Sequence, residues 1–208
     1  MSQNTAATRR RASSLRLQGH EPTRSVALVA VFAALVAASA LVPGIPVGAL
    51  GVPITLQTLA IMLTGLSLGA VRGSLAVLLY LTLGFVGLPV FSGGRSGLQV
   101  MATPSAGYLV AFVVAAFVVG LAAQVILART AASRRVPLFF VAAMVTSILV
   151  VHTLGVLGIT VTAHVPLAKA FQADLAFYPG DIVKNIVAAI AAAAVHRAFP
   201  DVLVRRLR

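Results

Sequence analysis

The sequence predicts an all-α integral membrane protein, a bundle of six transmembrane helices with both termini in the cytoplasm. The first observation is composition: 60% of the 208 residues are hydrophobic and 10% are charged, against about 45–50% and about 25% in soluble domains. The mean hydropathy is +1.03. A soluble domain of this length could not bury so much apolar surface, because its outside must carry charge. The other two observations are long stretches without ionisable residues and a biased distribution of the basic residues.

The stretches without ionisable residues set the predicted helices. No Asp, Glu, Lys or Arg occurs in residues 25–71, 73–94, 96–128 and 136–168. About 20 apolar residues cross a bilayer, so the first stretch holds two crossings, divided by the Pro- and Gly-containing segment 43–53. A last Ala/Val-rich segment ends at Pro200. The predicted helices are 25–42, 54–71, 73–90, 105–128, 137–157 and 181–198.

The basic residues predict the orientation. With a cytoplasmic N-terminus, 13 of the 16 Lys and Arg fall on cytoplasmic segments, and only Arg95, Lys169 and Lys184 fall at or near the outer face. This is a strong positive-inside pattern. Topology and contact with anionic lipid of the cell membrane then explain the net charge of +12, so no nucleic-acid partner is predicted.

The membrane domain is predicted to cover residues 25–200. Residues 1–24 are rich in Ser, Thr, Gln and Arg and contain no apolar run, which is typical of a disordered tail; residues 201–208 form a second basic cytoplasmic end. An alternative for the N-terminal region is a secretory signal cleaved near Ala38-Ser39-Ala40, although the charged region before Ser25 is long for such a signal.

Two charged residues that open the last predicted helix are candidates for a binding site. Asp181 and Lys184 follow Pro179-Gly180 and, being three residues apart, lie on nearly the same helix face. An unpartnered charge near hydrocarbon costs about 2.5–3.5 kcal/mol, so the two residues suit an acceptor and a donor that face a pocket inside the bundle. The alternative is that Asp181 caps the helix and Lys184 reaches the membrane surface.

Further polar residues lie near the same predicted face. Arg95 belongs to the glycine-rich segment 91–97, whose backbone can approach a ligand closely; the alternative is a flexible turn with a solvated arginine. Gln57 lies near the outer end of the second predicted helix, and Tyr80 and Tyr108 carry hydroxyl groups within the membrane. The alternative for these three is that each one satisfies a neighbouring helix.

Catalytic, metal and nucleotide sites are not predicted. The chain has no Cys and four acidic residues, and its histidines share no metal-binding spacing. The phosphate-binding pattern Gly-x-x-x-x-Gly-Lys-Ser/Thr is absent, so ATP-driven work would need another subunit. The string Gly65-Leu66-Ser67-Leu68-Gly69 matches Gly-x-Ser-x-Gly of serine hydrolases, but that motif works on a strand-to-helix turn and this copy lies on a predicted membrane helix.

Small residues form a stripe along the first predicted helix at a spacing of four residues, which lets two helices approach closely. The stripe is either a docking face for a separate membrane subunit or a packing face within the bundle; the last predicted helix has a similar alanine stripe, which favours packing. Its residues are Ala30, Ala34 and Ala38, beside Ala33 and Ala37.

Several segments resemble a known family. They are Pro53-Ile54-Thr55-Leu56-Gln57-Thr58-Leu59, Gly87-Leu88-Pro89-Val90-Phe91 with Gly93-Gly94-Arg95, Pro104 with Gly107-Tyr108-Leu109, and Pro179-Gly180-Asp181 with Lys184. In this order, with the six-helix layout, residues 25–200 resemble the BioY family, the biotin-binding membrane subunits (S components) of energy-coupling-factor (ECF) transporters. One departure is Ser105-Ala106, where the family typically has Thr-Gly.

The resemblance implies capture of biotin at the outer face of a prokaryotic cell membrane, without a cofactor in the chain itself. It implies that a transmembrane coupling subunit and two ATPase subunits are the partners, although some family members are thought to work without them. The alternatives are an S component for a different vitamin, an autonomous biotin transporter and, least favoured, an intramembrane enzyme.

The resemblance also indicates which residues hold biotin. Asp181 is expected to accept the N–H donors of the ureido ring, and Lys184 and Arg95 are expected to bind the valerate carboxylate. Apolar and aromatic side chains suit the bicyclic body. The other expected pocket residues are Gln57, Tyr108, Tyr80 and Phe91.

Overall fold

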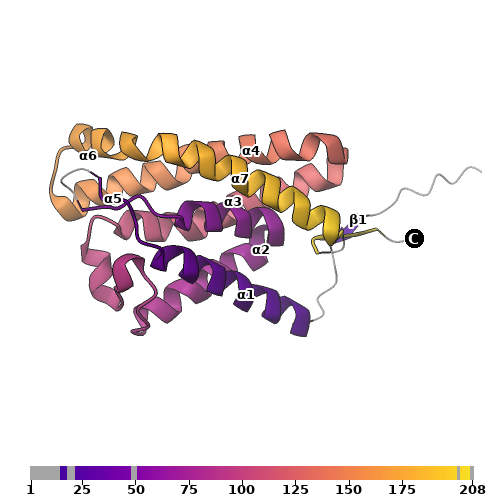
Figure 1. Cartoon of the computed structure of the whole chain (residues 1–208), viewed down its shortest axis with the longest axis horizontal. Helices are drawn as coiled ribbons and strands as arrows, with labels where there is room; N and C mark the ends of the chain where they lie inside the picture. The colour runs from indigo at the N-terminus through magenta and orange to yellow at the C-terminus, as the bar shows by residue number, and fades with distance from the viewer. Residues whose placement is uncertain (1–14, 18–21, 48–50, 201, 207–208) are drawn as a thin grey trace, which may run out of the picture.

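Long apolar stretches of this chain fold into helices, because in hydrocarbon each backbone N–H and C=O must be satisfied within its own segment. The computed structural model describes residues 15–17, 22–47, 51–200 and 202–206 as an elongated helical bundle (Figure 1). The α-helices are α1 (Pro22–Leu41), α2 (Gln57–Phe85), α3 (Ala106–Arg129), α4 (Arg135–Thr146), α5 (Thr153–Ala163), α6 (Leu167–Asp174) and α7 (Tyr178–Ala198).

Shorter elements complete the described chain. Two three-residue strands, β1 (Leu15–Leu17) and β2 (Val204–Arg206), pair antiparallel. Short 3₁₀-helices and one π-helix lie between the α-helices: η1 (Ser92–Gly94), η2 (Leu98–Ala102), η3 (Ala132–Arg134), η4 (Ser147–His152, the π-helix) and η5 (Leu175–Phe177). Within the described residues, five helical stretches are long and apolar enough to cross a membrane. This confirms the predicted class, a helical membrane protein with several spans.

Helix α2 consists of two arms that pack against each other. Its backbone breaks at Gly69, with φ 78° and ψ −178°, a conformation that favours glycine. Gln57 and Tyr80 are hydrogen-bonded at 2.9 Å, although 23 residues of straight helix would hold them about 34 Å apart. The sequence divides segments 54–71 and 73–90 at Arg72; the structure turns at Gly69 instead, because glycine can adopt the positive φ, and Arg72 lies inside the second arm.

Two other predicted helices are too short. Helical structure continues from Leu167 through α6 and η5 to the end of α7 at Ala198, rather than beginning at residue 181. Pro179 lies in the first turn of α7, where its missing N–H breaks no helical hydrogen bond, so the Pro-Gly pair begins α7 without ending the preceding helix. Likewise, the segment predicted at 137–157 extends over Ala132–Ala163.

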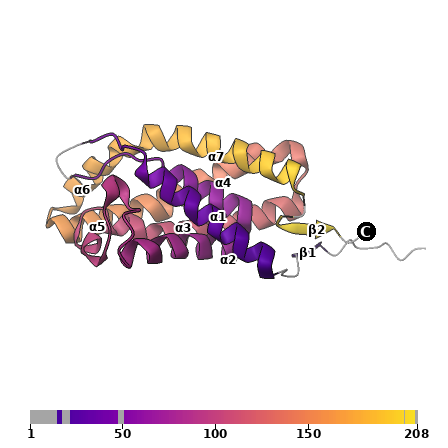
Figure 2. The ribbon, with the colours of Figure 1, turned by 60° about the horizontal axis from the view of Figure 1, so that its bottom comes forward.

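The described ends of the chain lie together at one end of the bundle. Figure 2 shows β1 and β2 beside the start of α1 and the end of α7, while α5 and α6 lie at the opposite end. Arg72 donates a hydrogen bond to the Val202 carbonyl near the start of β2. Of the predicted tail 1–24, residues 1–14 and 18–21 lie outside the described residues, and of the predicted end 201–208, so do 201, 207 and 208.

Alanines of α1 divide between two faces. Ala33 is buried against the bundle and Ala37 is half-buried, whereas Ala30, Ala34 and Ala38 are exposed. The predicted stripe therefore contributes to internal packing on one side only, and its other side is open on the surface of the described chain.

Candidate ligand-binding pocket

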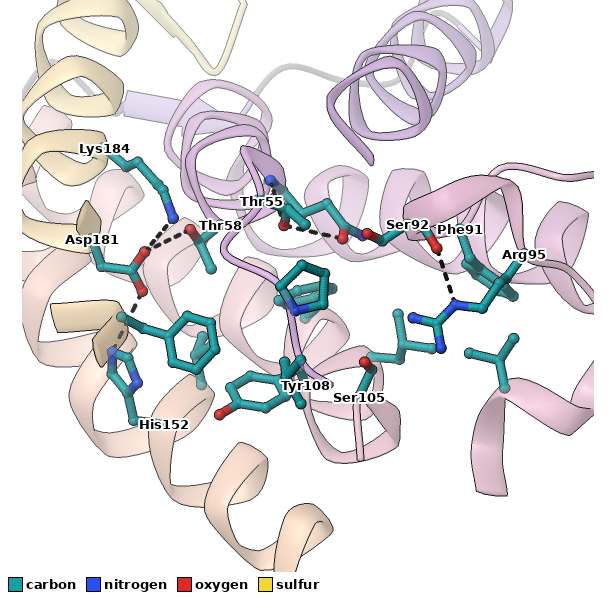
Figure 3. A pocket seen from close by; sticks show the side chains of 18 residues that line it. Thr55, Thr58, Phe91, Ser92, Arg95, Ser105, Tyr108, His152, Asp181 and Lys184 are labelled. Atoms are coloured by element: carbon teal, nitrogen blue, oxygen red, sulfur yellow. Dashed lines mark hydrogen bonds and ion pairs between the residues drawn. The ribbon is translucent and has the colours of Figure 1, made fainter. Parts of the chain in front are cut away.

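A pocket opens at the end of the bundle where α7 begins, opposite β1 and β2. Its empty volume, which includes space open to solvent, is about 590 Å³. Figure 3 shows its lining side chains. They come from the segment before α2 and its first turn, the loop after α2, the start of α3, the π-helix η4, the 3₁₀-helix η5 and the first turns of α7.

Asp181 and Lys184 form the first charged group of the pocket. Both are buried, with 2% and 8% of their surfaces exposed. Lys184 Nζ donates to Asp181 Oδ1 at 2.7 Å, and the Thr58 hydroxyl donates to the same oxygen at 3.0 Å. The pair faces the interior of the bundle. The structure therefore contradicts the alternative in which Lys184 reaches the membrane surface and Asp181 caps the helix.

A second buried carboxylate lies behind this pair. Asp174, at the end of α6, is fully buried and accepts a hydrogen bond from the Tyr108 hydroxyl at 2.6 Å. His152 Nδ1 faces both oxygens of Asp174, at 3.0 Å from Oδ1 and 2.9 Å from Oδ2. His152 Nε2 lies 3.5 Å from Asp181 Oδ2, so the imidazole joins the two carboxylates.

The π-helix η4 and the first turns of α7 bring these groups together. His152 ends the π-helix, an element that is often found at functional sites, and its ring stacks on Tyr178 with 4.2 Å between ring centroids. At the start of the same π-helix, the Ser147 hydroxyl accepts a hydrogen bond from the amide of Asn185 at 3.1 Å. Both ends of the π-helix therefore contact α7.

Arg95 lies on the opposite side of the pocket from Asp181 (Figure 3). It is half-buried, and its Nε donates to the Ser92 carbonyl at 3.0 Å. A backbone hydrogen bond of 3.0 Å from Phe91 N to Arg95 O closes the turn between them. The turn contains Gly93 and Gly94 with φ of 75° and 71°, conformations that residues with a Cβ adopt rarely.

Aromatic side chains form the apolar wall beside Arg95. Phe91 is 1% exposed and meets Tyr80 edge-on at 5.6 Å between centroids. Gly84 permits this packing, since a Cβ there would overlap the Phe91 ring. Gln57 donates from Nε2 to the Tyr80 hydroxyl at 2.9 Å, and its Oε1 accepts a hydrogen bond from the Thr55 hydroxyl at 3.2 Å.

The pocket brings together most of the residues that the sequence singles out, from separate parts of the chain. Tyr80 is the exception: it is fully buried behind Gln57 and Phe91 and does not line the pocket. Ser105, at the departure from the family pattern, does line it. The predicted residues that line the pocket are Asp181, Lys184, Arg95, Gln57, Tyr108 and Phe91.

Sequence reasoning missed His152, Asp174 and Thr58. The spacing of the histidines bears only on whether His152 could be a metal ligand. It does not indicate that Asp174, 22 residues away, is the partner of His152. A usable signal for Asp174 is its rarity, because the chain has four acidic residues. A carboxylate within a candidate membrane span is energetically costly, so its presence there indicates a functional site.

This fold and this pocket define a class: helical membrane proteins with a pocket, lined by buried charged residues, at one end of the bundle. The BioY family model matches residues 6–201. "Biotin transporter BioY" of Rhizobium etli is 42% identical over 179 residues, which cover 86% of this chain and 96% of the relative. "Biotin transporter BioY" of Rhodobacter capsulatus is 40% identical over 195 residues, covering 88% and 98%. The chain belongs to the BioY family.

A solved structure agrees with this assignment. The crystal structure of the S-component for biotin from an ECF-type ABC transporter superposes with a TM-score of 0.80 at 26% sequence identity. The match covers 88% of this chain and 95% of that one. The relatives are thus named as transporters and a transporter component, and none of these names describes an enzyme.

Proposed function

We propose that this chain is a biotin transport protein, the membrane subunit that captures biotin in the pocket at the start of α7. The observation that carries the proposal is the division of charge in one pocket: a buried Asp181–Lys184 pair on one side and Arg95 on the other, with an apolar wall between them. Biotin has the complementary pattern, because its ureido ring has two N–H donors, its body is apolar and its far end is a carboxylate. The names of the relatives support the same ligand.

The contacts of each side chain suggest its role. Asp181 Oδ1 already accepts two hydrogen bonds, so Oδ2 is the oxygen that we assign to the ureido N–H groups. Arg95 is assigned to the carboxylate, with a charge-assisted hydrogen bond. Lys184, which the sequence also assigns to the carboxylate, lies 2.7 Å from Asp181 on the opposite side of the pocket, so its proposed role is to hold Asp181 at the ureido ring. Tyr108 and Phe91 are assigned to the body of the ligand.

Two further residues of the predicted site have different assignments. Gln57 lines the pocket and can present its amide to the ligand. Tyr80 is assigned a supporting role, since it holds Gln57 by a hydrogen bond and Phe91 by an aromatic contact. A buried side chain that fixes two wall residues affects binding without touching the ligand.

The proposed topology has six crossings and a pocket at the outer face of the cell membrane. The two arms of α2 count as two crossings in this proposal, since the chain reverses at Gly69. Both termini are assigned to the cytoplasm, on the support of the positive-inside pattern and of the shared position of β1 and β2 at one end of the bundle (Figure 1).

Energy for uptake is proposed to come from an ECF module with a transmembrane coupling subunit and two ATPase subunits. The similar solved structure supports this, because that protein is an S-component of an ECF-type transporter. The exposed alanines Ala30, Ala34 and Ala38 of α1 are the proposed docking face, since small residues allow close approach of a second membrane helix. Autonomous biotin transport is the second candidate, and uptake assays with and without the module separate the two.

An enzymatic role finds little support at the one hydrolase-like string. Ser67 is fully buried, and within the described part of the chain its Oγ has no hydrogen-bond partner. The neighbouring residue Leu66 contacts a histidine, but through its backbone: His196 Nε2 is hydrogen-bonded to the Leu66 carbonyl at 2.8 Å. A nucleophile needs a base within hydrogen-bond reach of its own side chain.

The test of the proposed function is ligand-selective stabilisation of the purified protein. Biotin should raise the melting temperature, since a ligand at about 100 times its Kd stabilises the folded state by about 2.7 kcal/mol. Thiamine and riboflavin at the same concentration should leave the melting temperature unchanged. Stabilisation by one of these two and not by biotin would replace the ligand in this proposal.

A further inference from the structure

The imidazole of His152 lies between two buried carboxylates, and the proposed ligand roles do not use it. Its Nδ1 is 2.9 Å from Asp174 Oδ2, and its Nε2 is 3.5 Å from Asp181 Oδ2. The exposed fractions of His152, Asp174 and Asp181 are 3%, 0% and 2%. Both ring nitrogens therefore face carboxylate oxygens in a region with little solvent.

This geometry fits the imidazolium form of the ring. A neutral imidazole has one N–H donor and one lone pair, whereas the protonated ring donates from both nitrogens. A neutral ring at this position would direct its lone pair at one of the two carboxylates. The stacked ring of Tyr178, with 19° between the planes, suits a cation as well, because the faces of aromatic rings attract positive charge.

The charges that surround His152 indicate the same form. Asp174 at the end of α6 and Asp181 on α7 carry two negative charges, and among the described residues Lys184 is the one Lys or Arg in ion-pair contact with either. Tyr108 from α3 and Tyr178 from α7 are neutral neighbours. An uncompensated buried charge is expensive in a membrane protein, and a proton on His152 removes the imbalance.

We propose that His152 is a proton-binding positioning residue: it holds a proton between Asp174 and Asp181, and ligand binding at Asp181 depends on that proton. This inference rests on the proposed function, since the ligand concerned is biotin. With the proton in place, His152 and Lys184 balance the two aspartates, and Arg95 remains to balance the carboxylate of the ligand. Without it, the occupied pocket has one excess negative charge.

The sign of the pH dependence follows from this balance. The biotin-bound protein is more stable with the proton on His152 than without it. The affinity for biotin is therefore highest at the acidic end of the range and falls as the pH rises. Between about pH 6 and pH 9 the carboxyl group of the ligand stays ionised, and it does not contribute to the change. A single linked proton lowers the affinity by at most about tenfold for each pH unit.

The first experiment measures the Kd of biotin for the purified full-length protein across this pH range. We expect the Kd to rise by about tenfold or more from pH 6 to pH 9. A His152→Gln variant should bind more weakly at pH 6 and show a nearly constant Kd, whereas His164→Gln, which changes an exposed histidine outside the pocket, should keep the wild-type profile. A wild-type Kd that is constant with pH overturns the inference even where biotin binds, and absence of biotin binding at every pH overturns the proposed function with it.

A second measurement needs neither the ligand nor a stable His152 variant. Nitrogen NMR of the protein labelled on its 4 histidines distinguishes a ring with two N–H groups from a neutral tautomer. One histidine with both nitrogens protonated at neutral pH, lost from the spectrum of Asp174→Asn, is the expected result. Four neutral rings at pH 7 overturn the inference.

Discussion

The two sides of the pocket are built differently. On the α7 side, Asp181 is held by Thr58 and Lys184 and faces the His152 ring, and all the charged groups are buried. On the other side, Arg95 is half-buried and has one described side-chain hydrogen bond, to its own turn at Ser92. The α7 side is preorganised, which lowers the ordering cost of binding, whereas the Arg95 side can adjust to the far end of the ligand. Changes on the α7 side should therefore have the larger effects.

Asp181→Asn should have the largest effect. The substitution keeps the size of the side chain but removes the charge-assisted acceptor and leaves Lys184 without its buried counter-ion. A hydrogen bond to a charged group contributes about 1.5–3 kcal/mol, so the Kd of biotin should rise by at least about tenfold. Isothermal titration calorimetry measures it, with the circular dichroism spectrum as the check on folding. Unchanged affinity in a folded variant would remove Asp181 from the site.

Lys184→Met should come next, with an expected rise in Kd of about tenfold. The methionine fills a similar volume but leaves Asp181 without its 2.7 Å partner. Lys169→Met is the matched control, because Lys169 is exposed and does not line the pocket. Equal losses in the two variants would mean that the effect comes from net charge and not from the pocket.

Arg95→Gln should have a smaller effect, a rise in Kd of about three- to tenfold, since its charge is partly screened by solvent. The loss should be smaller still for a biotin derivative whose carboxylate is amidated, because the proposed partner of Arg95 is then absent. Direct binding of both ligands to both proteins measures this coupling. If Arg95→Gln weakens the amide as much as the free acid, Arg95 does not bind the carboxylate.

Tyr80→Phe should have the smallest effect on binding, about two- to fivefold, because it removes one neutral hydrogen bond from Gln57 and leaves the aromatic packing in place. A net contribution of about 0.5–1.5 kcal/mol is usual for such a bond. The measurement is the biotin Kd together with the melting temperature of the ligand-free protein. A larger loss than in Arg95→Gln would mean that Tyr80 touches the ligand after all.

A comparison on α1 tests docking separately from binding. Ala34 is exposed, whereas Ala33 is 3% exposed and packs inside the bundle. Ala34→Leu should leave the biotin Kd and the melting temperature unchanged and reduce biotin uptake by cells that express the ECF module. Ala33→Leu should instead lower the melting temperature, because overpacking a core costs about 1–3 kcal/mol. Normal uptake in Ala34→Leu would remove this face from the docking proposal.

The sequence predicts some elements of the fold more accurately than others. Charge-free stretches locate the apolar helices well, because the bilayer itself dictates their composition. The predicted helix bounds near Gly69 and Pro179 are wrong. A glycine or a proline can interrupt a helix, reverse the chain or begin a new helix, and packing against the rest of the bundle determines which of these occurs. At the site, Asp181, Lys184 and Arg95 can be found from the sequence because charges are rare in this chain.

His152 and Asp174 cannot be found in this way. Their contact depends on the π-helix η4, which ends at His152, and on α6, which ends at Asp174 and which the sequence does not predict. Neither is visible as periodicity, since both depend on contacts between segments.

The glycine turn at Arg95 has a consequence for the timing of capture and release. Gly97 N donates to the Gly84 carbonyl at 2.8 Å, so the turn is fastened to the end of α2 on one side while Gly93 and Gly94 are exposed on the other. We expect a molecule entering the pocket to meet the fixed α7 side first and the turn to settle over it afterwards. Stiffening that turn should then alter how long biotin stays bound far more than how fast it arrives.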